Sequence, residues 1–458
     1  MAYNRKQRLN DNIKAIETAF ILDREQRTPT ARERLLLERY CGFGGLKCIL
    51  NPARELADAV HWAKSDLELF APTVELHRLI RENSKNESEY KQLMDSLKQS
   101  VLTAFYTPSA VTEALTDVLK EHQIIPEKVL EPSAGIGAFV DSVLDNNPKA
   151  DIMAFEKDLL TGKILRHLHP EQKVRIEGFE KIEKPFNDYF DLAISNIPFG
   201  DVAVFDPSYT AMKGMRALVT RRIHNYFFVK ALDTVRDGGL VAFITSQGVL
   251  NAKNNSAARF MMLYHADLVS AIRLPNNLFT ENANTEVGSD LIILQKNSQK
   301  ESLRGDDNLL DTVYNDENRI PTNNYFLEHP ERIIHTTAKL DTDPFGKPAM
   351  IYTHEDGVEG IAEDLRRMLH EDFKKNFNLN RYLGIEETKA EEVKEVEETE
   401  KIEKTEKIKP SIEEKQNDTV VSLQKQEKPT DDAELSQKSN HQQPPVQMTL
   451  FDLWGMEE

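Results

Sequence analysis

Two glycines separated by one residue follow an apolar Val-Leu pair and could form a loop that holds a ligand. Residues 131–139 read Glu-Pro-Ser-Ala-Gly-Ile-Gly-Ala-Phe. Gly135 and Gly137 would let the backbone turn tightly and approach a ligand without Cβ clashes, and Glu131 stands where a strand would end. An ordinary turn is the alternative, so the residues on either side must decide between the two.

A second carboxylate and an amide follow later predicted strands. Glu156 comes roughly 20 residues after the glycines, where a carboxylate can accept both hydroxyls of a ribose, although an ordinary exposed strand-end glutamate is the alternative. Residues 195–200 read Ser-Asn-Ile-Pro-Phe-Gly. The Asn196 side chain and a neighbouring carbonyl can accept hydrogen bonds from an exocyclic amine, and Phe199 can stack on a base.

A short basic segment follows that amide. It contains Lys213, Arg216, Arg221 and Arg222 within a chain that is acidic overall. Side chains of this kind could hold phosphates beside a bound base. The alternative is a solvated surface loop, because short basic runs are common.

These residues require a scaffold that brings strand ends together, and the chain from residue 128 onward predicts one. Short apolar runs alternate with helical stretches, which is typical of a parallel sheet wrapped by helices. The predicted strands are 128–130, 151–155, 174–176, 190–195, 239–245, 268–273 and 291–295. The predicted helices between them are 138–144, 159–168, 224–235 and 256–264. The fold class is therefore α/β with seven strands.

Helices are predicted before the sheet. Apolar residues recur at helix-like spacing within the first 100 residues. One helix is expected to start at Pro29 with Thr28 as its N-cap, or alternatively at a capping box of Thr30 and Glu33, and to end near the glycines of residues 42–45. Thr107 and Pro108 predict another helix start, with Thr107 as the N-cap.

The chain divides into five predicted regions. They are a helical N-terminal region at 1–100, the α/β domain at 101–300, an extension at 301–385, a linker at 386–440 and a terminal segment at 441–458. The extension is either a small appended domain or a collar on the main one, with a helix near 361–369, and is a candidate DNA-contacting region. The linker is rich in Glu, Lys and Thr with few large apolar residues, which predicts disorder.

Composition limits the function classes. The net charge of −18 argues against a simple nucleic-acid binder, but residues 386–458 hold 20 acidic and 10 basic residues, so the body is only mildly acidic. No run approaches the roughly 18 apolar residues that span a bilayer, and no phosphate-loop motif occurs. Cys41 and Cys48 have no companions at zinc spacing, which predicts reduced thiols, no metal site and a cytoplasmic protein.

In combination and in this order, the segments resemble the S-adenosylmethionine-dependent amino-group methyltransferases of the N6-adenine DNA type. Residues 105–108, Phe-Tyr-Thr-Pro, resemble that family's Phe-x-x-Pro cofactor motif. Residues 131–137 resemble its Asp-Pro-x-x-Gly-x-Gly loop, and residues 196–199, Asn-Ile-Pro-Phe, its Asn-Pro-Pro-Tyr/Phe catalytic motif. Further segments at 41–45, 223–228 and 273–279 resemble the large methylases of phages and conjugative elements, which are often fused to helicases.

The resemblance implies a Rossmann-like methyltransferase domain and assigns roles to residues. The catalytic residues would be Asn196, Ile197, Pro198 and Phe199. The cofactor-binding residues would be Phe105, Tyr106, Thr107, Pro108, Glu131, Pro132, Ser133, Ala134, Gly135, Gly137, Phe139, Glu156 and Lys157. The DNA-contacting residues would be Lys213, Arg216, Arg221, Arg222 and Phe279. For Phe279, packing against the sheet is an equal alternative.

Two positions depart from the family pattern. Glu131 replaces the commoner aspartate, with a longer reach and the same charge. Ile197 replaces the first proline of the catalytic motif; it keeps the main-chain carbonyl expected to accept a hydrogen bond, but the loop loses some stiffness. The glycine loop is expected to admit the methionine part of the cofactor, so that Gly137→Asp would abolish cofactor binding and leave the fold intact.

The last segment reads as a docking peptide. Residues 447–451, Gln-Met-Thr-Leu-Phe, follow the polar linker, and an apolar cluster on a flexible tether is typical of a peptide that binds a groove. It resembles the pentapeptide by which many bacterial replication and repair proteins bind the sliding clamp, with Gln447, Leu450 and Phe451 as the contacting residues. A loose tail, or one that packs back on the body, is the alternative.

The predicted function is transfer of a methyl group from S-adenosylmethionine to the N6 amino group of adenine in DNA after base flipping, in a restriction-modification setting or on a mobile element. Two alternatives stay open. One is methylation of a protein glutamine amide or an RNA base. The other is a catalytically silent DNA-binding protein that acts as a modification decoy, for which Ile197 is the sequence hint.

Overall fold

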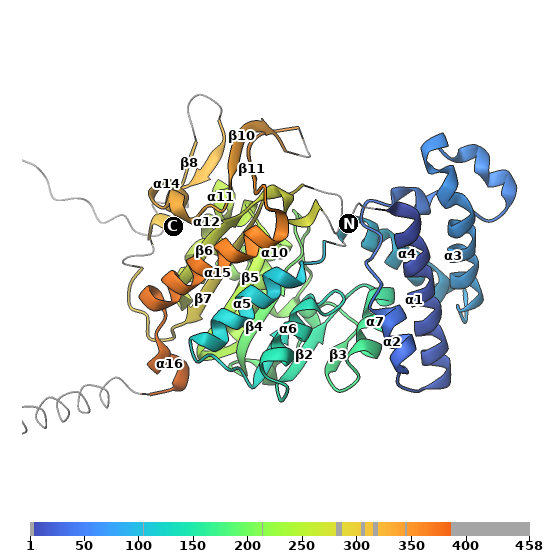
Figure 1. Cartoon of the computed structure of the whole chain (residues 1–458). Coiled ribbons are helices and arrows are strands. Elements are labelled where there is room, and N and C mark those ends of the chain that lie inside the picture. The colour runs from blue at the N-terminus through green and yellow to red at the C-terminus, as the bar shows by residue number, and fades with distance from the viewer. Residues whose placement is uncertain are drawn as a thin grey trace, which may run out of the picture. The chain divides into compact units, whose positions relative to one another are not determined.

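The computed structural model describes residues 4–103, 105–212, 214–280, 286–303, 307–314, 319–343 and 346–385 (Figure 1). Lys213 and all residues from 386 onward lie outside the described residues. The predicted linker and the terminal segment with Gln447, Leu450 and Phe451 therefore stay predictions.

A seven-stranded sheet carries the fold, in the order β3-β2-β1-β4-β5-β7-β6. The strands are β1 (Lys128–Glu131), β2 (Asp151–Phe155), β3 (Lys173–Arg175), β4 (Phe190–Asn196), β5 (Val235–Ser246), β6 (Ala266–Leu274) and β7 (Ser289–Lys296). Strands β1 to β5 pair in parallel, whereas β7 runs antiparallel to both β5 and β6. The predicted α/β class and the predicted strands are confirmed, apart from small shifts at their ends.

Side chains on β4 alternate between two cores, as a period of two residues requires of a strand covered on both faces. Leu192 and Ile194 belong to one cluster of buried residues, while Ala193 belongs to the other. Helices α5 (Ser109–Glu121), α6 (Ala138–Asn146) and α15 (Gly357–Asn376) cover the first face, and α10 (Ile223–Thr234) and α12 (Ser256–His265) cover the second. Figure 1 shows α5 and α15 lying side by side across the sheet.

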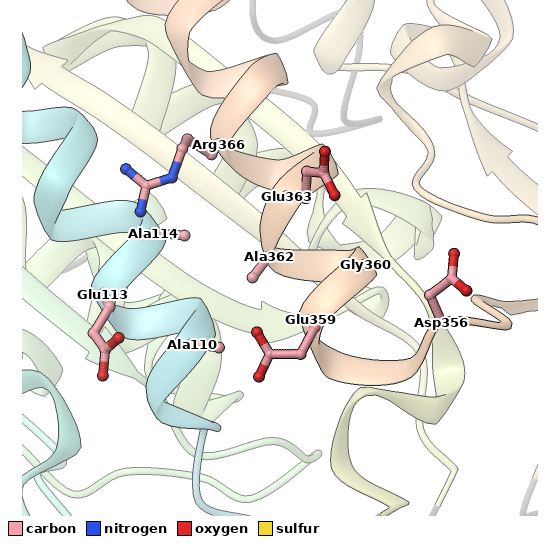
Figure 2. A pocket seen from close by; sticks show the side chains of 9 residues that line it. All are labelled: Ala110, Glu113, Ala114, Asp356, Glu359, Gly360, Ala362, Glu363 and Arg366. Carbon is pink, nitrogen blue, oxygen red and sulfur yellow. The ribbon is translucent and has the colours of Figure 1, made fainter.

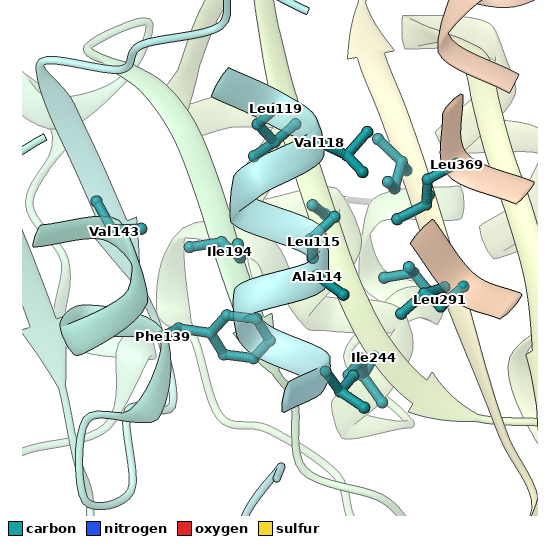
Figure 3. Packing of buried hydrophobic residues seen from close by; sticks show 14 of the residues in the cluster. Ala114, Leu115, Val118, Leu119, Phe139, Val143, Ile194, Ile244, Leu291 and Leu369 are labelled. Atoms are coloured by element: carbon teal, nitrogen blue, oxygen red, sulfur yellow. The ribbon is translucent and has the colours of Figure 1, made fainter. Parts of the chain in front are cut away.

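Helix α5 contributes the centre of the first core (Figure 3). Leu115, Val118 and Leu119 are buried at helical spacing and pack toward residues of β4, β5 and β7 such as Ile244 and Leu291. At roughly 25 cal/mol per Å² of apolar surface removed from water, burial of this stripe is what holds α5 in place. The segment before α5 is thereby fixed beside the strand ends.

The N-terminal region is helical, as predicted, and packs on the edge of the sheet domain. It contains α1 (Arg5–Glu25), α2 (Ala31–Leu37), α3 (Phe70–Glu82) and α4 (Glu87–Thr103). Their buried residues form one cluster with Leu160, Ile164 and Leu168 of α7 (Leu159–Leu168). These helices therefore lie against the helix that follows β2.

Of the two predicted starts for α2, the capping box is the one found. The Thr30 side chain accepts a hydrogen bond from the Glu33 N–H, and the Glu33 carboxylate accepts one from the Thr30 N–H. The helix ends at Leu37, earlier than the predicted end at the glycines. Gly42 and Gly45 instead form turns at φ values of 67° and 76°, because the left-handed region is open to glycine.

The region after β7 wraps the main domain. It contains the two-stranded pairs β8 (Thr312–Tyr314) with β9 (Pro321–Asn323) and β10 (Thr337–Thr342) with β11 (Pro348–Thr353), followed by α15 and α16 (Leu379–Leu383). Ile361, Leu365 and Leu369 of α15 lie in the same core as α5 and the sheet. This burial makes the described part of residues 301–385 a collar on the main domain. In the part of the chain that is described, no helix is long and apolar enough to cross a membrane.

Candidate active site

The ends of β1, β2 and β4 bring the predicted residues together. Glu131 is the last residue of β1, Glu156 follows β2, and Asn196 is the last residue of β4. The three strands are parallel neighbours, with β1 between the other two. Chain order reverses direction between β1 and β4, and the carboxyl ends of strands at such a point are where open α/β sheets bind ligands.

Gly135 and Gly137 shape the loop after β1. Their φ values are +56° and +95°, in a region that side chains rarely adopt. The loop is tied to β2, since the Ala134 N–H donates to the Phe155 carbonyl at 2.8 Å and the Gly135 N–H donates to Glu156 Oε2 at 2.8 Å. A pure turn would not need that second bond, so the glycine loop and the second carboxylate form one unit.

Both glycines also make room for the chain's own side chains. A Cβ on Gly135 would lie 2.8 Å from the Tyr106 ring, and one on Gly137 would lie 2.6 Å from His169 Nε2 and 2.9 Å from Leu165 Cδ1. The structure therefore argues against the expectation that Gly137→Asp leaves the fold undisturbed, because His169 and Leu165 would have to shift. We expect this substitution to lower the melting temperature, because it combines overlap with a left-handed backbone that costs roughly 1–2 kcal/mol.

The segment 105–108 lies between the glycine loop and the catalytic motif. The Asn196 Nδ2 donates a hydrogen bond to the Phe105 carbonyl at 2.8 Å, and the Tyr106 ring covers Gly135. The Thr107 hydroxyl is buried without a hydrogen-bond partner. The prediction that Thr107 caps α5 is wrong: Pro108 stands at the N-cap position and no side chain caps the helix. The hydroxyl is thereby left for another contact.

Glu131 is a buried carboxyl group whose hydrogen bonding is poor. It is 1% exposed, and no donor has full hydrogen-bond geometry to either oxygen, although the Ser195 hydroxyl and the Ser133 N–H lie near enough to lower its pKa in part. The hydroxyl of nearby Ser195 donates instead to the Ser133 carbonyl, at 3.4 Å. Burial raises the pKa of Glu131 well above its usual range, because a charged carboxylate is poorly solvated there. A ligand that brings donors or positive charge would remove that penalty.

Glu156 is more fully bonded. Its Oε1 accepts from the Asp158 N–H at 2.7 Å while Oε2 accepts from Gly135. Burial, and then the negative charge of Asp158, raise the pKa of Glu156 to about 8. Each oxygen has a second lone pair, so the group can still accept two hydroxyls. Lys157 is exposed at the rim, with Glu180 at 3.9 Å.

The catalytic motif extends the strand pairing of β4 with β5 beyond the last residue of β4. Ile197 is buried, and its N–H donates to the Ile244 carbonyl of β5 at 3.0 Å. A proline at this position has no N–H and could not make this bond. The stiffness that the family's proline would give is thus supplied here by strand pairing.

Phe199 is partly buried and meets Phe279 edge-on, with ring centroids 6.3 Å apart. Phe279 is fully buried and also contacts the Phe105 ring at 6.4 Å. Its burial favours the packing alternative over direct contact with DNA. Phe279 instead links the cofactor motif to the catalytic motif.

The basic segment is not brought together as a group. Arg216 forms a two-pronged ion pair with Asp233 at 2.6 and 2.9 Å, and Arg222 bonds Asp201 at 2.6 Å. Arg221 is exposed and has no side-chain partner among the described residues. Of the predicted DNA-contacting cations that the structure describes, only Arg221 is free for a phosphate.

A supporting network was missed by the sequence analysis. The Ser96 hydroxyl of α4 donates to Asp158 Oδ2 at 2.7 Å and accepts from the Leu160 N–H at 3.0 Å. Asp158 caps α7 through the Thr161 N–H, and the Tyr40 hydroxyl meets Thr161 Oγ1 at 3.2 Å. The spacing of Asp158 and Thr161 is a readable cap signal, but nothing local in the sequence connects Ser96 to it.

A hollow of about 470 Å³ lies elsewhere, between α5 and α15 (Figure 2). Glu113, Glu359 and Glu363 line it together with Arg366. None of its lining residues belongs to the predicted cofactor or catalytic sets. Among the described residues, no cluster of His, Cys, Asp and Glu could hold a metal ion.

Comparison with known proteins decides the family. The sequence profile of the N-6 DNA Methylase family matches residues 88–391, which is more than half of the chain and includes every motif of the site. The chain belongs to the N-6 DNA methylase family. S-adenosylmethionine is accordingly the cofactor.

Two curated relatives and one solved structure are similar to the methylase over parts of their lengths. "Defense against restriction protein B" of Escherichia phage P1 is 29% identical over 201 residues, 43% of this chain and 8% of the relative. "Type II methyltransferase M.XamI" of Xanthomonas campestris pv. amaranthicola is 25% identical over 173 residues, 35% of this chain and 33% of the relative. The chain thus matches no more than a third of either relative.

The solved structure is the methyltransferase subunit of a type I restriction-modification system from Streptococcus thermophilus. It is 15% identical, with a TM-score of 0.38, over 70% of this chain and 69% of that one.

The residues present in the methylase fit the cofactor. S-adenosylmethionine carries an ammonium group, ribose hydroxyls and an adenine amine, all of which need acceptors. The site offers the unsatisfied Glu131 carboxyl, the buried Thr107 hydroxyl and the free lone pairs of Glu156. When bound, the cofactor supplies an electrophilic methyl group on a sulfonium.

Proposed function

We propose that this methylase transfers the methyl group of S-adenosylmethionine to the N6 amino group of adenine in DNA, after the base has been flipped out of the duplex. The observation that carries the proposal is the fixed orientation of the Asn196 amide. Its Nδ2 is held by the Phe105 carbonyl at 2.8 Å, so Oδ1 is the atom left to accept a hydrogen bond from an amine.

Two acceptors would prepare the amine for reaction. The adenine N6 lone pair is delocalised into the ring and is a weak nucleophile. Hydrogen bonds from the amine to Asn196 Oδ1 and to the carbonyl of Ile197 would favour a geometry in which the lone pair is free to attack the methyl carbon in line. No residue of the chain forms a covalent intermediate in this scheme, because the carbon–nitrogen bond would form as the carbon–sulfur bond breaks. The methylated N6 would then release one proton to water.

Phe199 would hold the flipped base. Extruding a base from a duplex costs a few kcal/mol, and stacking on an aromatic ring recovers roughly 1–3 kcal/mol per base. Phe199 is partly exposed, and its edge contact with Phe279 fixes its ring. The three catalytic-motif contacts would therefore act on one planar base.

The test is transfer of a labelled methyl group to DNA by the wild-type chain and by Asn196→Ala. Transfer should fall by about 100-fold or more in the variant, by analogy with loss of one preorganised polar group. Cofactor binding, measured by calorimetry, should persist, because Phe105 stays packed on Phe279. Asn187→Ala, at an exposed asparagine, is the matched control. Equal transfer by wild type and Asn196→Ala would contradict the proposal.

The same assay separates the alternatives. Label in RNA or in protein glutamine, with none in DNA, would favour the other methyltransferase classes. DNA binding without any transfer would favour a silent decoy. The hydrogen bond from Ile197 to Ile244 opposes the decoy reading, since it removes the expected looseness of the motif.

A protective role is the biological setting that we propose. The matched region of 201 residues is shared with a phage protein whose name is defense against restriction. Methylation at a restriction site blocks base contacts in the major groove that sequence recognition needs. The methylase would therefore mark the DNA of the mobile element that carries it, as in a restriction-modification system.

The terminal peptide is proposed to tether the methylase to the sliding clamp of newly copied DNA. The proposal rests on the sequence of residues 447–451 alone. A peptide of residues 441–458 should bind purified clamp, and replacement of Leu450 and Phe451 by alanine should remove that binding. Absence of binding by the intact peptide would end this proposal and leave the enzymatic one untouched.

A further inference from the structure

Phe205 is a large apolar side chain that the fold leaves in solvent. It is 77% exposed, six residues after Phe199 of the catalytic motif. A ring that stays largely in water gains little of the free energy that burial of apolar surface gives on folding. Single exposed apolar residues are common, so the surroundings of Phe205 decide whether its position has a use.

The backbone on both sides of Phe205 is fixed. The Val204 N–H donates to the Thr220 carbonyl at 2.8 Å. Asp206 is buried, and its carboxylate accepts from the Tyr226 hydroxyl at 2.7 Å and from Lys230 Nζ at 3.2 Å. With both neighbours anchored, Phe205 is held outward.

A backbone hydrogen bond joins the segment of Phe205 to a segment that carries an exposed cation. The Thr220 carbonyl accepts the hydrogen bond from the Val204 N–H. Phe205 and Arg221 are the residues that directly follow these two bonded residues in the chain. Arg221 is exposed without a side-chain partner among the described residues. An apolar ring and an exposed guanidinium on two segments that are paired through their backbones match the two parts of a nucleic-acid strand, its stacked bases and its phosphates.

This surface is joined to the catalytic motif. Arg222 Nε donates to Asp201 Oδ1 at 2.6 Å, and Arg222 Nη1 donates to Asn255 Oδ1 at 2.6 Å. Asp201 is two residues after Phe199. The loop that carries Phe205 is therefore braced to the body beside the site where the target base would bind.

We propose that Phe205 inserts into the DNA base stack beside the target adenine, while Arg221 pairs with a neighbouring phosphate. The proposal rests on the proposed function. Flipping leaves a gap in the duplex, and apolar side chains wedged between base steps stabilise opened DNA. The ring would thus lower the cost of opening without touching the reacting atoms, which makes Phe205 a positioning residue.

The wedge predicts a dependence on how the target base is paired. We would compare single-turnover methylation by wild type, Phe205→Ala and Phe205→Trp on oligonucleotides built around the site mapped by sequencing methylated DNA. One duplex carries a paired target and a second carries the target opposite an abasic position. Phe205→Ala should slow the paired duplex by about tenfold or more and leave the second within about twofold, because the second needs little opening.

Controls separate this role from folding and from the chemistry. Phe205→Trp should retain the wild-type rate on the paired duplex, and Leu56→Ala, at a distant residue that is 86% exposed, should change neither substrate. Arg221→Gln should make the dependence of log affinity on log salt less steep, by the amount that about one phosphate contact contributes. Phe205→Ala should leave that slope unchanged.

Two results would overturn the wedge while the proposed function stands. One is an unchanged rate of Phe205→Ala on the paired duplex. The other is an equal loss on both duplexes, which would mean that Phe205 serves the fold or the chemistry. Absence of any methylated adenine in the DNA sequenced to map the site would instead refute the proposed function, and the wedge with it.

Discussion

At the scale of residues, the site depends on backbone hydrogen bonds as much as on side chains. Ile197 differs from the family's proline, yet its N–H pairs with the Ile244 carbonyl and extends the sheet into the motif. Glu156 likewise acts on the backbone, because its two oxygens accept from Gly135 and Asp158. Changes at these positions alter loop geometry before they alter any contact with a ligand.

Protonation of Glu156 should appear in the stability of the protein. Its pKa is raised to about 8 in the folded chain, above the roughly 4.3 of an unfolded glutamate. Between those values the folded state holds a proton that the unfolded state has released, so the free energy of unfolding falls as pH rises. In Glu156→Gln, melting temperature measured from pH 5 to 8 should fall less steeply than in wild type.

A control distinguishes this effect from general charge repulsion. Glu17→Gln removes an exposed carboxylate on α1 and should leave the slope of wild type in place. Burial also raises the pKa of Glu131, so the melting temperature of Glu156→Gln should still fall somewhat as pH rises. Parallel curves for wild type and Glu156→Gln would show that the pKa of Glu156 is close to its ordinary value.

At the scale of elements, the N-terminal helices support the cofactor loop. Helix α4 reaches the site through Ser96, which bonds Asp158 and Leu160 at the start of α7. Asp158 in turn donates its N–H to Glu156, which holds Gly135. The bonds from Ser96 and from Gly135 join segments that are distant in sequence, and the local bond between Asp158 and Glu156 connects them, so α4 and the glycine loop form a single supported unit.

Removal of Ser96 should therefore cost stability. We expect Ser96→Ala to lower the free energy of unfolding by about 1–3 kcal/mol, because a buried carboxylate loses a donor and a buried N–H loses an acceptor. Denaturant unfolding measures this directly. Ser88→Ala on the exposed face of the same helix should change it by less than about 0.5 kcal/mol. Similar values for the two variants would contradict the network.

At the scale of the whole molecule, the helices and strands could be predicted from local sequence patterns. The contacts between segments that are distant in sequence could not. The strand 151–155 and the helix 159–168 were predictable to the residue, because apolar runs with the right period end at polar residues there. The sheet order and the docking of α1 to α4 on α7 could not be predicted, since periodicity says which face is buried and not what buries it.

The candidate site divides in the same way. Spacing along the chain identified Glu131, Glu156 and Asn196, which the sheet does bring together at the carboxyl ends of neighbouring strands. Spacing could not decide between DNA contact and the structural alternatives for Arg216 and Phe279, because the ion pair with Asp233 and the full burial of Phe279 depend on residues that are distant in sequence. Phe205 carried no sequence signal, since exposure of an apolar residue is visible only in the fold.

The central claim is that the methyl group goes to N6 of adenine in DNA. It is tested most directly by incubating unmethylated DNA with the wild-type chain and S-adenosylmethionine carrying a deuterated methyl group, then digesting the DNA to nucleosides for mass spectrometry. We predict that the label appears in N6-methyldeoxyadenosine and is absent with Asn196→Ala. Label on a cytosine nucleoside, or in protein or RNA added to the same reaction and not in DNA, would contradict the account.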